Sequence, residues 1–224
     1  MKIISVRKGF TADHSSTSYE FLAIDKPLDK EARNDVSSLS SRAHPSRRRV
    51  DFVYNVEGYD IPGGWKPLME DYYDVMYSES YGWWTFCIAF DLNSKEQEEK
   101  LLKYDFRGVE DLGTDIRIED GRAVITIYSR LDASYIAPQN ENWDIFDDEN
   151  LEYEADDYLL TILSAIRKQI MDGNYDALYS VWKEYGLELG EKEKSEEFLV
   201  PKLANYDRSN PLIKTFSAML NCPF

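Results

Sequence analysis

The sequence predicts an α+β fold, in which a mainly antiparallel, ferredoxin-like sheet (split βαβ) with a helical insertion is followed by a C-terminal helical segment. Strand-like and helical apolar periods alternate through the first half of the chain. The run from Trp83 to Leu92 is largely apolar on both faces, as expected in the middle of a covered sheet. From about residue 150 the apolar spacing is helical. We therefore expect a sheet domain over residues 1–136 and a helical segment packed on it over residues 150–224.

The first elements are expected to be strands that enclose one helix. Strand-like apolar content is found over residues 1–6, 19–24 and 50–56. Asp29 is placed to cap a helix between the last two of these stretches, and Pro45 breaks the loop that follows. The helix carries its apolar side chains on one face: Ala32, Val36 and Leu39.

A helical insertion is predicted ahead of the strand at Trp83. Pro67 suits the first turn of a helix. Its apolar stripe comprises Leu68, Tyr72, Val75 and Met76. After the strand, Asn93 and Glu96 fit a capping box for a short helix. Asp120 and Gly121 then supply the positive φ angles of a type I′ hairpin turn between two strands.

The C-terminal part predicts three helices. Gly173 ends an apolar stripe that begins at Leu159, and Gly186 closes a second helix that contains Trp182. Asn210, followed by proline, begins the last helix. The intervening acidic runs lack the glycine and the oxygen spacing of a calcium loop, so no metal site is predicted there.

The charge distribution is uneven along the 224 residues. The chain carries a net charge of −16, yet residues 1–50 hold ten Lys and Arg against six Asp and Glu. The remainder therefore has a net charge of −20. Such an acidic protein should repel nucleic acid and anionic membranes and favour basic partners. We expect a protein partner and no direct contact with nucleic acid or membrane.

Cysteine content and the N-terminal sequence favour a cytoplasmic location. Cys87 and Cys222 show no disulfide framework and no metal-ligand spacing. The first residues contain no apolar stretch of the length that a signal peptide needs, and no segment approaches the length of a membrane span. Phosphate-binding loops, dinucleotide fingerprints and zinc-protease motifs do not occur in the sequence either, so no cofactor is predicted.

His14 lies in the stretch TADHSSTS, between Asp13 and Ser15. The members of a Ser-His-Asp triad normally come from separate segments of a chain. Hydrogen bonds from Ser, Thr and Asp to nearby backbone amides explain the stretch equally well. We interpret it as a structural loop, with no catalytic residue assigned, and retain His14 and Asp25 only as weak candidates for a general base.

The dense basic cluster in SSRAHPSRRRV is the best candidate site in the sequence. It contains Arg42, Arg47, Arg48 and Arg49. Arginine forks suit the recognition of phosphate or carboxylate, so these four residues are the predicted anion-binding residues. The alternative is that they pair with carboxylates of the protein itself.

Three stretches carry a resemblance to a family of bacterial and archaeal hypothetical proteins. They are SYEFLAIDKPLDKEARNDVSSLSSRA, LMEDYYDVMY and LSAIRKQIMDGNYDALYSVW. The shared pattern resembles Y-E-F-x-A-I-D-[RK]-P-L early in the chain and G-[DN]-x-x-A-L-Y-x-x-W later, while HPSRRR departs from it. The resemblance implies that the two halves of the chain occur together, and it implies nothing about chemistry.

The leading hypothesis is a cytoplasmic, non-enzymatic interaction protein whose acidic surface binds a basic protein or nucleoprotein. The acidic excess and the missing catalytic motifs favour it. One alternative is a phosphate- or nucleotide-handling enzyme that uses Arg42 and Arg47–Arg49 as an anion clamp. Another is a DNA mimic that inhibits a nucleic-acid enzyme.

Overall fold

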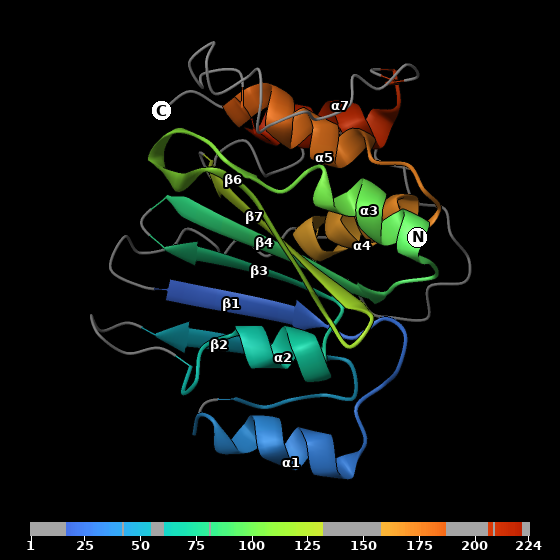
Figure 1. The fold of residues 1–224 in the computed structure, drawn as a ribbon. Helices are drawn as coiled ribbons and strands as arrows, with labels where there is room; N and C mark the ends of the chain where they lie inside the picture. Colours follow the sequence, from blue (N-terminus) through green and yellow to red (C-terminus); the bar gives the residue numbers. More distant parts are fainter. Residues whose placement is uncertain are drawn as a thin grey trace.

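The computed structural model describes residues 17–41, 43–54, 61–80, 82–131, 158–186, 206–207 and 209–220. They form an α+β fold around a seven-stranded sheet in the order β2-β1-β3-β4-β7-β6-β5 (Figure 1). The strands are β1 (Thr17–Leu22), β2 (Arg49–Tyr54), β3 (Val75–Ser80), β4 (Trp83–Asp91), β5 (Phe106–Arg107), β6 (Gly113–Glu119) and β7 (Arg122–Arg130). The helices are α1 (Lys30–Ser38), α2 (Lys66–Asp71), α3 (Lys95–Leu102), α4 (Tyr158–Met171), α5 (Asp176–Val181) and α7 (Pro211–Leu220), with a 3-10 turn η1 (Val109–Asp111) and a π-helical turn η3 (Trp182–Gly186).

Every strand pairing in the described sheet is antiparallel. In one half of the sheet, β2 and β3 flank β1, and the chain passes from β2 to β3 through α2. In the other half, β4 and β6 flank β7, and the connection from β4 to β6 contains α3. These two units lie side by side in one sheet. The α+β class and the antiparallel sheet are therefore confirmed, but the ferredoxin-like split βαβ arrangement is not, and the sheet is larger than that fold requires.

The predicted helix from Pro67 is too long. α2 ends at Asp71, and Val75 and Met76 belong to β3, which pairs with β1 on one side and β4 on the other. Val75 packs into the core on one face of the sheet and Met76 into the core on the other. A short apolar run of this kind fits both the period of a helix and that of a strand, and pairing with distant strands decides between the two structures.

Several local predictions are confirmed, and one is displaced by a residue. Asp29 caps α1 by accepting a hydrogen bond from the backbone of Ala32. Asp120 and Gly121 both have positive φ, as the hairpin turn requires. The cap of α3 is Ser94, which accepts from the backbone of Gln97, so the proposed box of Asn93 and Glu96 is wrong. The predicted strand at residues 1–6 lies outside the described residues.

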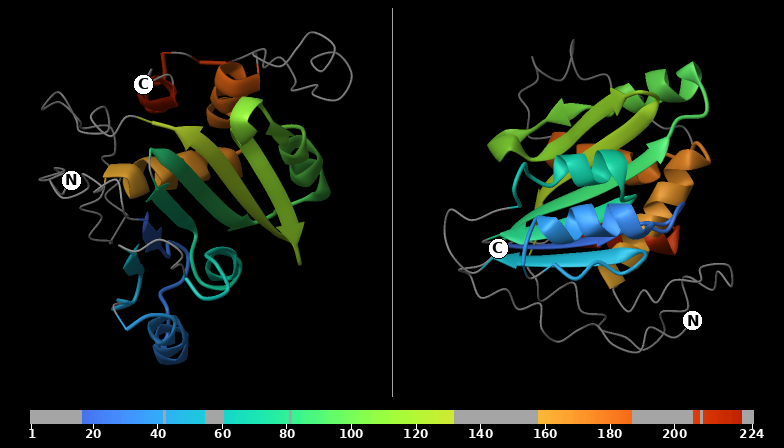
Figure 2. Two further views of the ribbon diagram at one scale, coloured as in Figure 1. Left: turned by 90° about the vertical axis from the view of Figure 1, so that its left-hand side faces the viewer. Right: turned by 90° about the horizontal axis from the view of Figure 1, so that it is seen from below.

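Two cores cover the two faces of the sheet. One contains side chains of α1 and α2 packed on β1, β2 and the middle strands. The other contains the apolar faces of α3, α4, α5 and α7 packed on β3, β4, β6 and β7. α1 lies beyond the β2 edge, and α5 and α7 lie at the opposite end of the molecule (Figure 2). α4 lies behind the sheet in the view of Figure 1, and the side chain of its Arg167 reaches Asp25, just after the end of β1.

Candidate functional site

A cluster of charged side chains lies where β1 ends and β3 begins. The carboxylate of Asp74 is only 6% exposed. One oxygen accepts hydrogen bonds from the backbone N–H groups of Ile24, at 2.6 Å, and Asp25, at 2.9 Å. The other oxygen contacts the guanidinium of Arg122 at 3.0 Å and that of Arg167 at 3.5 Å. Asp74 is thus a buried anion that meets four donors.

Arg167 brings α4 into this cluster. Its side chain is 5% exposed. Nε donates to the carbonyl oxygen of Ala89 in β4 at 2.7 Å, and Nη2 donates to the carboxylate of Asp25 and to Asp74. Because a buried charge is costly unless it is paired and hydrogen-bonded, these contacts fix how α4 lies across the sheet.

Arg122 connects the same carboxylate to the end of α2. Its guanidinium donates to the carbonyl oxygens of Met69 and Tyr73 as well as to Asp74. It also contacts Asp91, whose side chain is 79% exposed. The charges of the two arginines and of their carboxylates are paired within the cluster. The cluster therefore holds α2 and α4 against the strands.

The predicted residues Asp25 and Arg48 both make contacts at the backbone segment that follows β1. The carboxylate of Asp25 is 45% exposed and pairs with Arg167. Arg48 donates through Nη1 to the carbonyl oxygens of Ala23, at 3.0 Å, and Ile24, at 2.6 Å. Both side chains therefore hold the end of β1 in place.

The structure shows no hydrogen bond or ion pair between the other predicted arginines that it describes, Arg47 and Arg49, and the side chains of Asp25 and Arg48. Arg49 forms an ion pair with the buried carboxylate of Glu20 at 3.1 Å. Arg47 is exposed, and its carbonyl oxygen accepts from the backbone of Leu28. Arg42 and His14 lie outside the described residues. Arg49 thus pairs with a carboxylate of the protein itself, whereas Arg48 contacts backbone carbonyl oxygens. The role of these arginines in anion binding stays a prediction.

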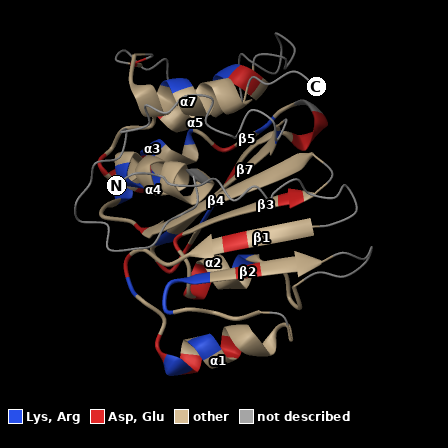
Figure 3. Ribbon diagram, turned by 180° about the vertical axis from the view of Figure 1, so that it is seen from behind, with Lys and Arg blue, Asp and Glu red and all other residues tan. Residues whose placement is uncertain are grey.

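A second charged feature surrounds Tyr72, between α1 and α2. Its hydroxyl donates to the carboxylate of Asp35 at 3.2 Å. Burial, that hydrogen bond and the nearby charges of Asp35, Asp71 and Asp29 raise the pKa of Tyr72. The three aspartates are exposed, and we call them the acidic patch. Basic residues are interspersed with them along α1 (Figure 3), and Arg33 donates to the backbone of Asp29.

The described residues contain no group of three or more His, Cys, Asp or Glu that could hold a metal ion. None of the helices that the structure describes is long and apolar enough to cross a membrane.

Asp74, Arg122 and Arg167 escape a search of the sequence by motif. One signal was available: Arg167 follows Ile166 inside the apolar stripe of α4. A charge so close to a buried helical face predicts a buried partner. The identity of that partner comes only from the fold, because Asp25 and Asp74 are far from Arg167 in sequence.

No family model, curated protein or solved structure matches this chain.

Proposed function

We propose that this protein is a cytoplasmic, non-enzymatic interaction protein that binds a basic protein or nucleoprotein partner through its acidic surface. One observation carries the proposal: the exposed carboxylate of Asp35 accepts a hydrogen bond from the half-buried Tyr72, and the exposed Asp29 and Asp71 of the acidic patch lie close enough for their charges to raise the pKa of Tyr72. The net charge of −16 adds a long-range field that attracts a basic partner.

The chemistry of the patch suits a lysine or arginine side chain. A cation from the partner can contact the ring of Tyr72 and pair with a neighbouring carboxylate. Tyrosine is one of the residue types that are enriched among the few residues that dominate binding energy at interfaces. Association driven in this way is fast at low ionic strength and weakens as salt screens the charges.

The contacts of the arginines favour this function over the enzymatic alternative. A phosphate-handling site needs guanidinium groups that are available to the ligand, whereas Arg48 binds backbone carbonyls and Arg49 pairs with Glu20. A DNA mimic needs rows of carboxylates at phosphate-like spacing, and carboxylates grouped around one ring support it less well.

The test neutralises the acidic patch without removing the helix cap. In the variant Asp29→Asn/Asp35→Asn/Asp71→Asn, asparagine at position 29 still caps α1, because Asn and Asp are about equally good at that position. The matched control removes the same charge from α3, as Glu96→Gln/Glu98→Gln/Glu99→Gln. Wild type and both variants are used for native pull-down from lysate of the source cell at low and high salt.

We expect wild type and the α3 control to retain a stoichiometric basic partner at low salt and to release it at high salt. The acidic-patch variant should lose most of that partner already at low salt. Equal retention by both variants, or binding that does not respond to salt, contradicts the proposal. A phosphorylated metabolite that co-purifies without any protein partner would instead direct attention to the arginines.

A further inference from the structure

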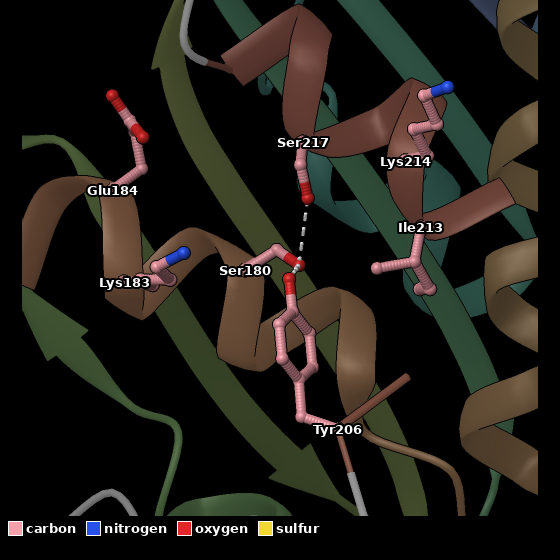
Figure 4. A pocket seen from close by; sticks show the side chains of 7 residues that line it. All are labelled: Ser180, Lys183, Glu184, Tyr206, Ile213, Lys214 and Ser217. Carbon is pink, nitrogen blue, oxygen red and sulfur yellow. Dashed lines mark hydrogen bonds between the residues drawn. The ribbon is translucent and has the colours of Figure 1, made fainter. Parts of the chain in front are cut away.

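A pocket of about 200 Å³ lies between the end of α5, the π-helical turn η3, residue 206 and α7 (Figure 4). Its lining residues are Ser180, Lys183, Glu184, Tyr206, Ile213, Lys214 and Ser217. Figure 4 shows Lys183 and Glu184 on one wall and Lys214 and Ser217 on the other. The volume is smaller than that of pockets for drug-sized ligands, so the pocket suits a small metabolite.

Three hydroxyl groups meet on one side of the pocket. Ser180 is 4% exposed and donates its only proton to the carbonyl oxygen of Asp176 at 2.9 Å. Ser217 donates to Ser180 at 3.1 Å. The bond of 2.9 Å between Ser180 and Tyr206 therefore has Tyr206 as its donor. Because Ser217 has used its proton, it presents acceptor lone pairs to a ligand.

Two lysines supply positive charge to the same pocket. Neither Lys183 nor Lys214 takes part in an ion pair within the part of the chain that the structure describes. Glu184 is the acidic residue of the lining. The lining therefore carries one more positive than negative charge, in a protein whose net charge is −16. A pocket of this kind attracts an anion.

The backbone of this wall departs from a regular helix. Trp182–Gly186 forms a π-helical turn, which places Lys183 and Glu184 at the pocket. Gly186 permits the turn to close, because a Cβ there would lie 2.7 Å from Cδ1 of Trp182. Such turns are rare and occur frequently at functional sites.

We propose that this pocket binds a small organic anion that bears a hydroxyl group. Lys183 and Lys214 hold the anionic group, and the hydroxyl of the ligand donates to Ser217. This binding site is separate from the acidic patch and does not depend on the proposed partner, so either proposal can fail without the other.

Isothermal titration calorimetry on the full chain tests the site. The probes are two pairs matched for charge: malate against succinate, and 2-hydroxyethyl phosphate against ethyl phosphate. The first member of each pair carries the additional hydroxyl group. The pocket variant Lys183→Met/Lys214→Met removes both cations. The matched control for lost charge, called the α3 lysine control, is Lys95→Met/Lys103→Met, at the first residue of α3 and at its C-cap.

We expect saturable binding of one hydroxylated probe to wild type and to the α3 lysine control, with affinity reduced at least tenfold in the pocket variant. Ser217→Ala should remove the preference for the hydroxylated member of the pair. Absence of saturable binding by all four probes overturns the site. An equal loss in both lysine variants means that binding is non-specific, and equal affinity within each pair in wild type overturns the assignment of Ser217.

Discussion

Asp74→Asn is expected to destabilise the fold strongly, because it changes the hydrogen-bonding capacity of a buried side chain without changing its size. The carboxylate uses one oxygen for two backbone N–H groups and the other for two guanidinium groups. An asparagine side chain has one acceptor oxygen, and its NH2 group must face one of these pairs of donors. Either orientation therefore places donors against donors.

The size of the loss in the free energy of unfolding depends on which hydrogen-bond donors lose their acceptor. If the amide NH2 faces the arginines, Arg122 loses a charge-assisted hydrogen bond and Arg167 keeps only the carboxylate of Asp25 and the carbonyl oxygen of Ala89. If it faces the backbone, the N–H groups of residues 24 and 25 lose their partner. Breaking a buried ion pair in this way costs about 3–5 kcal/mol.

Urea unfolding followed by tryptophan fluorescence measures the loss. With a denaturant dependence of about 2 kcal/mol per molar urea, the unfolding midpoint should fall by about 1.5–2.5 M. Asp91→Asn is the matched control, because Asp91 pairs with the same Arg122 but is 79% exposed. A surface pair of this kind contributes about 0–1 kcal/mol.

The two variants together show whether the buried carboxylate of Asp74 stabilises the fold more than the exposed carboxylate of Asp91. If Asp74→Asn costs no more than Asp91→Asn, the cluster does not depend on a buried anion and the reasoning is refuted. Combining Asp74→Asn with Arg167→Met in a double-mutant cycle should give a combined loss smaller than the sum of the single losses, because the two residues belong to one network.

Two further predictions concern close packing and a buried thiol. Gly108→Ala should lower the free energy of unfolding by about 1–3 kcal/mol, because the added Cβ would lie 2.6 Å from the carbonyl oxygen of Tyr185. An unchanged urea midpoint would mean that the backbone after β5 does not pack against η3 this closely. Burial raises the pKa of the Cys87 thiol from 9.0 to about 12. The unfolded chain therefore releases that proton first, and between pH 9 and 10 the free energy of unfolding should fall as pH rises, by up to about 1.4 kcal/mol per pH unit. Cys87→Ala should flatten that slope, and identical slopes in the two proteins would contradict the assignment.

Much of the candidate site lay beyond prediction from the sequence. The sequence predicts Asp25 as a weak candidate for a base and Arg48 as part of an anion clamp, and the structure shows both making internal contacts at the end of β1. The sequence predicts Asp29 as a helix cap, but it does not predict that Asp29, Asp35 and Asp71 lie near Tyr72. Their grouping requires α1 and α2 to lie side by side, which local sequence does not specify.

The sequence by itself determined the features whose energetics are local. The α+β class, the cap at Asp29 and the hairpin turn at Asp120 depend on backbone preferences and hydrogen bonds within a few residues, so composition and spacing predict them. Only the tertiary structure decided that residues 75–80 form a strand and that Asp74 and Arg167 are paired. Strand pairing and the burial of a charge depend on partners far along the chain, and Asp25 and Arg167 are separated by 142 positions. Such partners stabilise a buried charge only after the sheet and α4 have come together.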